Sequence, residues 1–326
     1  MKPASARSLV RLHTSLLIGA ALACVSAARS ETSVRRDLNY AGSRDPEQTL
    51  DVYLPDARTD PPDTYSHGGR PIVMWIHGGG WAAGDKSDTI GPKAQACTER
   101  GFIFVSINYR LFFSPKENPG TSRPAVGIRD IELDIAKAVR WLHDNAADFG
   151  GDPDSVFVAG HSAGAQLAAL FCTDDSYLRS EGLTFAVIKG CIPVDGDTYY
   201  PPLQIDTSTP REAAGKRPMF PDEAAQRDLS AVMHVAAGKD IPPFLLLHVS
   251  DFPETRTRLQ TEILAQTLRD AGIGAKVFAA EGKTHLTISS DLGRPGEPVT
   301  RALLDFLDEQ VWRADYATWG RPPGNR

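Results

Sequence analysis

The sequence predicts an α/β protein with a mostly parallel, doubly wound sheet. From residue 71 onward, short apolar runs rich in β-branched residues alternate with amphipathic helical segments, which is the pattern of βαβ units. Glycine-rich turns follow two of these runs, at 76–84 and 160–164. The 326 residues, of which 41% are hydrophobic, are enough to bury one large core.

Seven segments are predicted to be strands. The first alternates apolar and polar side chains, which is typical of a half-exposed strand. The others are short, continuous apolar runs, as expected for strands buried on both faces of a sheet. The segments are 49–55, 71–77, 101–109, 155–160, 185–194, 243–250 and 275–280.

Two helices are predicted from apolar residues that recur at helical spacing. Ile131, Ile135, Ala138 and Leu142 lie on one face of the segment 130–147. The segment that starts at Arg256 repeats the pattern and ends before a glycine. Both helices are expected to cover the sheet.

A long connection at about 195–241 is rich in proline, charge and turn residues. A connection of this length without strong apolar periodicity usually has a function, so we expect a small cap insertion here. Tyr199 and Tyr200 open this segment and are candidates either for substrate contact or for packing within the cap.

The amino terminus has the pattern of a signal peptide. Lys2, Arg7 and Arg11 precede the apolar segment LLIGAALACVSAA, whose small residues favour cleavage after Ala27 or Ala28. We therefore expect residues 1–27 to be removed and residues 28–326 to form one exported domain, periplasmic or secreted.

The alternatives to a cleaved signal are a membrane anchor and a lipoprotein. The apolar run is shorter than the roughly 20 residues of a membrane-spanning helix, which disfavours an anchor. A lipoprotein attached at Cys24 is the lesser option, because Ala21 stands where a lipobox usually has leucine. No later segment is long and apolar enough to cross a membrane.

Charge and cysteine content exclude several classes of partner and cofactor. Removing residues 1–27 takes away three basic side chains and no acidic one, so the formal net charge falls from −6 to −9. This charge disfavours nucleic acid and anionic membranes as partners. Cys97, Cys172 and Cys191 have no metal-site spacing and allow at most one disulfide. No metal is expected, and no motif indicates a nucleotide cofactor.

The sequence GHSAG at 160–164 is the strongest functional signal. It follows a predicted strand and begins a helical segment, so Ser162 is expected on a sharp strand-to-helix turn with its hydroxyl exposed above the sheet. The flanking glycines permit a tight turn and close packing of the helix. These features predict that Ser162 is a nucleophile.

A serine nucleophile needs a base, which an acid must orient. Of the three histidines after Ser162, His285 lies in a polar loop beyond the last predicted strand, where the base is expected. Asp251 directly follows the strand at 243–250 and is the preferred acid, with Glu254 as the reserve candidate.

The sequence HGGGW at 77–81 is predicted to hold an oxyanion. A tetrahedral intermediate needs backbone N–H donors, and glycines let the backbone turn its amides inward. Gly79 and Gly80, with the amide of Ala163, are the expected donors. Trp81 is a candidate either for lining the substrate pocket or for bracing this loop.

At these positions the sequence resembles serine esterases of the α/β-hydrolase fold, of the hormone-sensitive-lipase and bacterial feruloyl-esterase-like type. The resemblance rests on HGGGW, GHSAG, NYR at 108–110, FGGDP at 149–153 and the late His285. It implies a carboxylester hydrolase with Ser162, Asp251 and His285 as the catalytic triad, a small-molecule ester as substrate and no cofactor. One residue is missing around Asp251 relative to the usual pattern.

Two other functions remain open. The same residues serve amide, formamide or peptide hydrolases, because the leaving group is recognised by the cap and the pocket. A catalytically silent binding protein on this fold is the alternative from another class, and the intact catalytic positions argue against it. The sequence does not indicate an oligomeric state.

Overall fold

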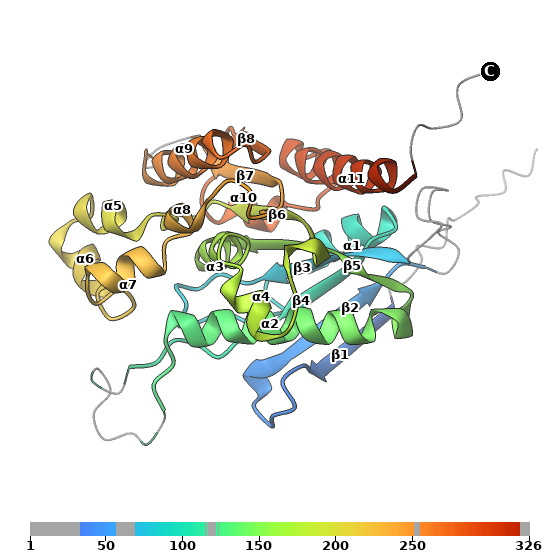
Figure 1. Cartoon of the computed structure of the whole chain (residues 1–326), viewed down its shortest axis with the longest axis horizontal. Coiled ribbons are helices and arrows are strands. Elements are labelled where there is room, and N and C mark those ends of the chain that lie inside the picture. Colours follow the sequence, from blue (N-terminus) through green and yellow to red (C-terminus); the bar gives the residue numbers. More distant parts are fainter. Residues whose placement is uncertain are drawn as a thin grey trace, which may run out of the picture. The chain divides into compact units, whose positions relative to one another are not determined.

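The computed structural model describes residues 33–56, 69–114, 116, 122, 124–250 and 255–319. The predicted signal segment, including Cys24, and both acid candidates, Asp251 and Glu254, lie outside these ranges. In the described part, eight strands form a sheet with the order β1-β2-β4-β3-β5-β6-β7-β8 (Figure 1). The strands are β1 (Ser33–Asn39), β2 (Thr49–Leu54), β3 (Arg70–Ile76), β4 (Ile103–Ile107), β5 (Gly151–His161), β6 (Ile188–Val194), β7 (Phe244–Val249) and β8 (Ala275–Ala280).

The sheet is mostly parallel, as predicted. Strands β3 to β8 pair in parallel, whereas β2 pairs antiparallel with both β1 and β4. Each of the seven predicted segments contains a strand, although residues 185–187 form a short 3-10 helix ahead of β6. The additional strand, β1, has the sequence SVRRDLN and lies at the sheet edge. Its charged, largely exposed residues protect that edge from pairing with other chains.

Helices cover both faces of the sheet and also form the connection between β6 and β7. The predicted helix at 130–147 and the one beginning at Arg256 are present as α2 and α9. The helices are α1 (Gly91–Glu99), α2 (Ile128–Asn145), α3 (Ala163–Phe171), α4 (Ser176–Ser180), α5 (Pro201–Asp206), α6 (Pro210–Lys216), α7 (Glu223–Asp228), α8 (Ala231–His234), α9 (Thr255–Asp270), α10 (Thr287–Asp291) and α11 (Pro298–Trp319).

The core has two apolar layers, one on each face of the sheet. Alternate side chains of β3 divide between them, because successive residues of a strand point to opposite faces. Ile72 and Ile76 pack with α2, α3 and α9, whereas Val73 and Trp75 pack with α1, α10 and α11. The predicted apolar face of α2 is fully buried in the first layer, as its spacing indicated.

The connection between β6 and β7 holds four short helices, α5 to α8. Figure 1 shows α5, α6 and α7 grouped at one end of the sheet, on the opposite side of the view from α11. Helix α8 packs against α3 and α9, which attaches this segment to the domain. No helix in the described part is both long and apolar enough to span a bilayer.

The topology brings several loops to one edge of the sheet. Strands β3, β5, β6, β7 and β8 are parallel neighbours, so their carboxyl ends point the same way. The loops that follow these strands therefore meet, and in open parallel sheets this edge is where ligands bind. The predicted glycine loop follows β3, and GHSAG joins β5 to α3.

The turn between β5 and α3 requires glycine at two positions. A Cβ atom on Gly160 would lie 2.3 Å from the carbonyl oxygen of Gly164, and one on Gly164 would lie 2.2 Å from that of Ile76. These contacts are with backbone atoms, which cannot rotate away. Helix α3 can therefore approach β3 only with glycine at these positions, as the sequence indicated.

We predict that Gly164→Ala lowers the free energy of unfolding by about 3 kcal/mol or more, because the new methyl group must displace α3 or β3. The matched control is Gly215→Ala in α6, where a Cβ meets no atom within 4 Å. Gly215→Ala should raise the free energy of unfolding by about 0.5–1 kcal/mol, because alanine is more favourable than glycine inside a helix. Urea unfolding measures both, and equal effects of the two substitutions would contradict this account of the turn.

Candidate active site

Ser162 lies on the turn between β5 and α3 with a strained backbone. Its φ of 58° and ψ of −119° are unusual for a residue with a side chain. The turn is held by the N–H of Ser162, which donates to the carbonyl of Val194 at the end of β6, at 3.0 Å. The hydroxyl is thereby presented at the carboxyl edge of the sheet, as GHSAG predicted.

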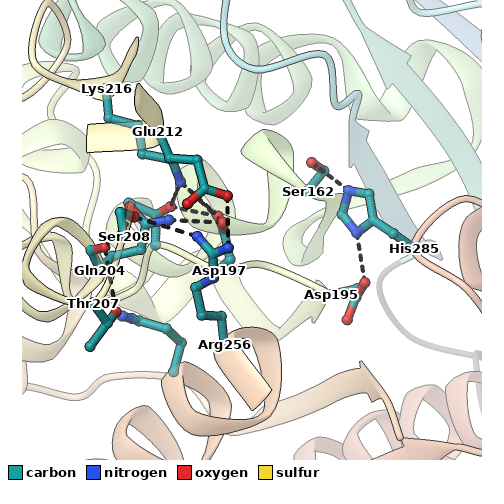
Figure 2. A network of polar contacts seen from close by, with 12 residues as sticks. Ser162, Asp195, Asp197, Gln204, Thr207, Ser208, Glu212, Lys216, Arg256 and His285 are labelled. Carbon is teal, nitrogen blue, oxygen red and sulfur yellow. Dashed lines mark hydrogen bonds and ion pairs between the residues drawn. The ribbon is translucent and has the colours of Figure 1, made fainter. Parts of the chain in front are cut away.

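His285 lies in the loop between β8 and α10 and contacts Ser162. Its Nε2 is 2.9 Å from the Ser162 hydroxyl oxygen, and its Nδ1 is 2.6 Å from a carboxylate oxygen of Asp195 (Figure 2). Because an ionised carboxylate only accepts hydrogen bonds, Nδ1 carries the proton and Nε2 is left to accept from the serine. This is the tautomer that a general base needs.

The carboxylate beside His285 belongs to Asp195, which corrects the prediction of Asp251. Asp195 directly follows β6, and its side chain is fully buried. Its second carboxylate oxygen accepts the N–H of Val249 at 3.0 Å, and its own N–H donates to the carbonyl of Leu247 at 2.7 Å. The carboxylate is thus fixed between β6 and β7. Asp251 and its reserve Glu254 are not among the described residues, so the structure assigns neither a contact.

The Asp195 carboxylate changes the acid–base properties of His285. Its hydrogen bond to the imidazole raises the pKa of His285, against the opposing effect of burial. The negative charge of Asp195 acts in the same direction as the hydrogen bond. His285 is therefore a stronger base than an isolated histidine.

His161, which lies between Gly160 and Ser162 in GHSAG, supports the loop that carries His285. Its Nε2–H donates to the carbonyl oxygen of His285 at 2.7 Å, and the two rings are 4.6 Å apart. Burial, together with the neighbouring His285, lowers the pKa of His161 to about 4, so this ring is neutral near pH 7. The sequence analysis did not identify this role.

The other two histidines after Ser162 have structural hydrogen bonds. His248 is buried in β7 and donates from Nδ1 to the carbonyl of Val249. His234 donates from Nε2 to the carbonyl of Asp228 within the connection between β6 and β7. Neither hydrogen bond is with Ser162.

The glycine loop after β3 lies against the turn at Ser162. A Cβ on Gly78 would be 3.2 Å from that of Ser162. Gly79 and Gly80 both have positive φ values, 113° and 61°. Among the described residues, none accepts a hydrogen bond from the N–H groups of Gly79, Gly80 or Ala163. Three unused donors therefore lie on the two segments that meet at the serine.

His77 holds the start of this glycine loop. Its Nδ1–H donates to the carbonyl of Gly78 at 2.7 Å, and its ring stacks on that of Tyr109 at 4.2 Å. The Tyr109 hydroxyl donates to the carbonyl of His77 at 3.1 Å. Burial lowers the pKa of His77, which keeps the ring neutral. HGGGW and NYR are thus in direct contact.

Trp81 braces the glycine loop. Its indole N–H donates to Gln166 of α3 at 2.9 Å, and its ring packs edge-on against Phe220. The side chain is almost completely buried. Of the two predicted roles for Trp81, these contacts favour packing.

Tyr199 is a packing residue and does not face a substrate. It is fully buried, and its hydroxyl accepts the N–H of Gly196 at 3.1 Å. This corrects its candidacy for the substrate pocket, because the space around the ring is already filled. Tyr200 is partly exposed, and its backbone N–H donates to the side chain of Gln260 at 2.7 Å.

An ion pair connects α6, in the connection between β6 and β7, to the loop after Asp195. Lys216 of α6 lies 3.0 Å from a carboxylate oxygen of Asp197 and also donates to Thr198 (Figure 2). The Lys216 ammonium lies 5.9 Å from the centre of the Trp81 ring, within cation–π range. Helix α6 is therefore tied to both the glycine loop and the loop that follows Asp195.

The described residues offer no candidate metal centre. No group of three or more histidine, cysteine or acidic side chains among them has the geometry for a metal ion. Cys97, Cys172 and Cys191 are buried free thiols, and burial raises the pKa of Cys97 to about 12. The site consists of protein groups at the carboxyl edge of the sheet.

Comparison with known proteins identifies the family. The model of the carboxylesterase family matches residues 24–197, which is just over half of the 326 residues. The chain therefore belongs to the carboxylesterase family.

Several known proteins resemble the chain. The probable carboxylic ester hydrolase LipM of Mycobacterium tuberculosis is 30% identical over 196 residues, which are 57% of this chain and 42% of LipM. The probable isoprenylcysteine α-carbonyl methylesterase ICMEL1 of Arabidopsis thaliana is 28% identical over 275 residues, 77% of this chain and 51% of that protein. The chain thus spans about half the length of these relatives.

A solved structure supports the fold. The inhibited esterase B of Lactobacillus rhamnosis superposes with a TM-score of 0.71 at 22% identity, over 88% of this chain and 90% of that one. A likeness at this identity shows the fold alone. Together with the sheet order, it confirms the predicted α/β-hydrolase fold.

We predict that Asp195→Asn lowers the pKa of His285, because the substitution removes the negative charge that favours the imidazolium. NMR titration of the His285 ring measures this change. The matched control is Asp251→Asn, which should leave the titration of His285 as it is in the unmodified protein. A shift with Asp251→Asn and none with Asp195→Asn would restore Asp251 as the acid.

Proposed function

We propose that the protein is a serine carboxylic ester hydrolase that acts through a catalytic triad of Ser162, His285 and Asp195. The observation that carries the proposal is the position of His285, which is hydrogen-bonded to the serine hydroxyl on one side and to a buried carboxylate on the other. Such an arrangement activates a hydroxyl that is otherwise a poor nucleophile.

In the first half of the reaction, the Ser162 oxygen attacks the ester carbonyl carbon and His285 Nε2 takes the serine proton. The tetrahedral intermediate then collapses as the bond to the alcohol oxygen breaks. His285 returns its proton to this oxygen, so a neutral alcohol leaves. Asp195 holds the ring orientation and stabilises the imidazolium throughout.

In the second half, water hydrolyses the acyl-enzyme. His285 takes a proton from the water, whose oxygen attacks the acyl carbon. Collapse of the second tetrahedral intermediate breaks the bond to the Ser162 oxygen, which recovers its proton from His285. The product is a carboxylic acid, and no cofactor enters either half-reaction.

The N–H groups of Gly79, Gly80 and Ala163 stabilise the oxyanion of both tetrahedral intermediates. Their lack of acceptors among the described residues and their proximity to the turn at Ser162 support this role. Loss of one such donor typically costs about 100- to 1000-fold in rate. Ala163 is also the first residue of α3, where the helix dipole favours negative charge.

Membership of the carboxylesterase family supports ester hydrolysis as the reaction class. LipM is named as a probable carboxylic ester hydrolase, and ICMEL1 as a probable methylesterase. Both names describe proteins that cleave esters, which favours an ester over an amide as the substrate of this chain.

Ser162→Ala tests the nucleophile. We predict that it abolishes labelling by a fluorophosphonate probe and lowers kcat for p-nitrophenyl acetate by at least about 10⁴-fold, because no other group can form the acyl-enzyme. The corresponding anilide, p-nitroacetanilide, should be a far poorer substrate. Unimpaired turnover by Ser162→Ala, or preference for the anilide, would contradict the proposal.

The pH dependence follows from the role of His285 as a base. Only the neutral imidazole accepts the serine proton, so kcat/KM should rise with pH as His285 loses its proton. Because Asp195 raises the pKa of His285, the midpoint should lie above the ordinary value of 6.5. Asp195→Asn should move the midpoint to lower pH. A midpoint unaffected by this substitution would exclude His285 as the titrating group.

His161 is expected to act as a positioning residue for the base. His161→Leu removes the hydrogen bond to the His285 carbonyl and should lower kcat by about 10-fold or more while KM changes little, because the base is misplaced. His161→Gln keeps an N–H donor and should recover most of the rate. Steady-state kinetics give kcat and KM for both variants. Equal kcat values for His161→Leu and His161→Gln would argue against loss of the hydrogen bond as the cause of the lower rate.

A further inference from the structure

A cavity of about 560 Å³ opens beside Ser162, on the side of the sheet that carries α1 and α10. Its walls come from the glycine loop, the residues just before α1, and the segment from His285 through α10. The volume lies within the range of small-molecule sites in proteins. The cavity is continuous with the proposed active site, since Ser162 and His285 line it.

The position of this cavity indicates which part of an ester it receives. In the proposed reaction, His285 protonates the departing alcohol oxygen, so that oxygen must come within hydrogen-bond reach of Nε2. His285 and the adjoining Leu286 form one wall, and Leu286 is exposed at its rim. An alcohol group attached to the departing oxygen enters this cavity directly.

Three polar groups on the walls have unused hydrogen-bonding capacity. The Ser289 side chain lines the cavity, and none of the described residues is hydrogen-bonded to its hydroxyl. One oxygen of Asp88 accepts the N–H of Asp85 at 2.9 Å, which leaves the other oxygen for a ligand. In His161 the proton is on Nε2, so its Nδ1 is a free acceptor beside the serine. Trp75 contributes little apolar surface, because it is almost fully buried and the Lys93 ammonium lies over its ring.

The residues just before α1, which form one wall of the cavity, include one with an unfavourable backbone conformation. Thr89 lines the cavity with a φ of +53°, which is strained for a β-branched residue. The Lys93 ammonium fixes it by donating to the carbonyl of Thr89 at 2.8 Å and to its hydroxyl at 3.2 Å. Lys93 is 1% exposed, and its ammonium also lies 4.9 Å from the centre of the Trp75 ring, within cation–π range. The strained backbone of Thr89 opposes folding, and such strain often occurs at binding sites.

We propose that this cavity is the alcohol subsite and that it recognises a polyhydroxylated alcohol the size of one sugar ring. The proposal rests on the ester hydrolase function proposed above and names its substrate class. A hydroxylated ring can donate to Asp88 and His161 and exchange a hydrogen bond with Ser289. A hydrocarbon ring of the same shape would displace water from these polar groups and offer them no hydrogen bonds in return. Leaving polar groups without partners in this way is strongly disfavoured.

Two acetate esters with the same acyl group and ring size test the proposal. One is methyl glucoside acetylated on its primary hydroxyl, and the other is cyclohexylmethyl acetate. The quantity measured is the ratio of their kcat/KM values with the mature protein. We expect a ratio of at least about 10 in favour of the glucoside, equivalent to one or two hydrogen bonds. A damaged triad lowers both values, so its effect cancels in this ratio.

Two variants locate the preference in this cavity. Ser289→Ala should lower the ratio by about 2- to 10-fold, and Asp88→Asn, which removes a charged acceptor, by about 10-fold. The matched control is Ser180→Ala in α4, which packs against α2 on the other face of the sheet and should leave the ratio unchanged. Thermal unfolding of each variant verifies that it is folded.

The possible outcomes distinguish a failure of the alcohol-subsite proposal from a failure of the ester hydrolase function on which it rests. A ratio of one or less, or a high ratio that neither Ser289→Ala nor Asp88→Asn changes, overturns the alcohol subsite while leaving the esterase proposal intact. Cleavage of p-nitrophenyl acetate without cleavage of either matched ester also overturns the subsite. Failure to cleave all three esters contradicts the ester hydrolase function itself, and the subsite with it.

Discussion

The strained backbone of Ser162 is the constraint on which the site depends. A positive φ at a residue with a side chain costs on the order of 1–3 kcal/mol and persists only where the surroundings enforce it. Here the enforcement comes from packing: α3 lies so close to β3 that Gly164 has no room for a methyl group beside the Ile76 carbonyl. The same approach brings the glycine loop after β3 against the serine. The nucleophile and the proposed oxyanion donors are thus positioned by one close contact.

The remaining parts of the site are held by hydrogen bonds between loops that follow neighbouring strands. Asp195 is fixed at both its N–H and its carboxylate by the backbone of β7, and it in turn fixes the ring of His285. His161 holds the backbone of His285 from the opposite side. The base is thereby oriented through its ring and through its main chain, although its side chain is 46% exposed. Because the ring of His285 is already oriented, little rearrangement of the protein is needed as charge develops in the transition state.

The sequence was sufficient for the fold and for the positions of Ser162 and His285, because each has a local pattern whose place in an α/β sheet is determined. It was not sufficient for the acid. Asp195 and Asp251 each directly follow a predicted strand, and β6 and β7 are neighbours whose ends meet at one edge. The rule that nominated Asp251 therefore applies equally to Asp195, and only the three-dimensional contact with His285 distinguishes them. The sequence left two roles open for Tyr199, and its burial favours packing. It did not indicate the role of His161, because the carbonyl partner of that ring is 124 residues away.

The most direct test of the account is to trap the acyl-enzyme. The reaction with p-nitrophenyl acetate is stopped in acid within the first turnover, and the chain is digested and analysed by mass spectrometry. The account predicts a burst of one equivalent of p-nitrophenol per chain and a single acetyl group on Ser162, with neither in Asp195→Asn at the same reaction time. Hydrolysis that proceeds without an acetylated Ser162, or with the acetyl group on another residue, would contradict it.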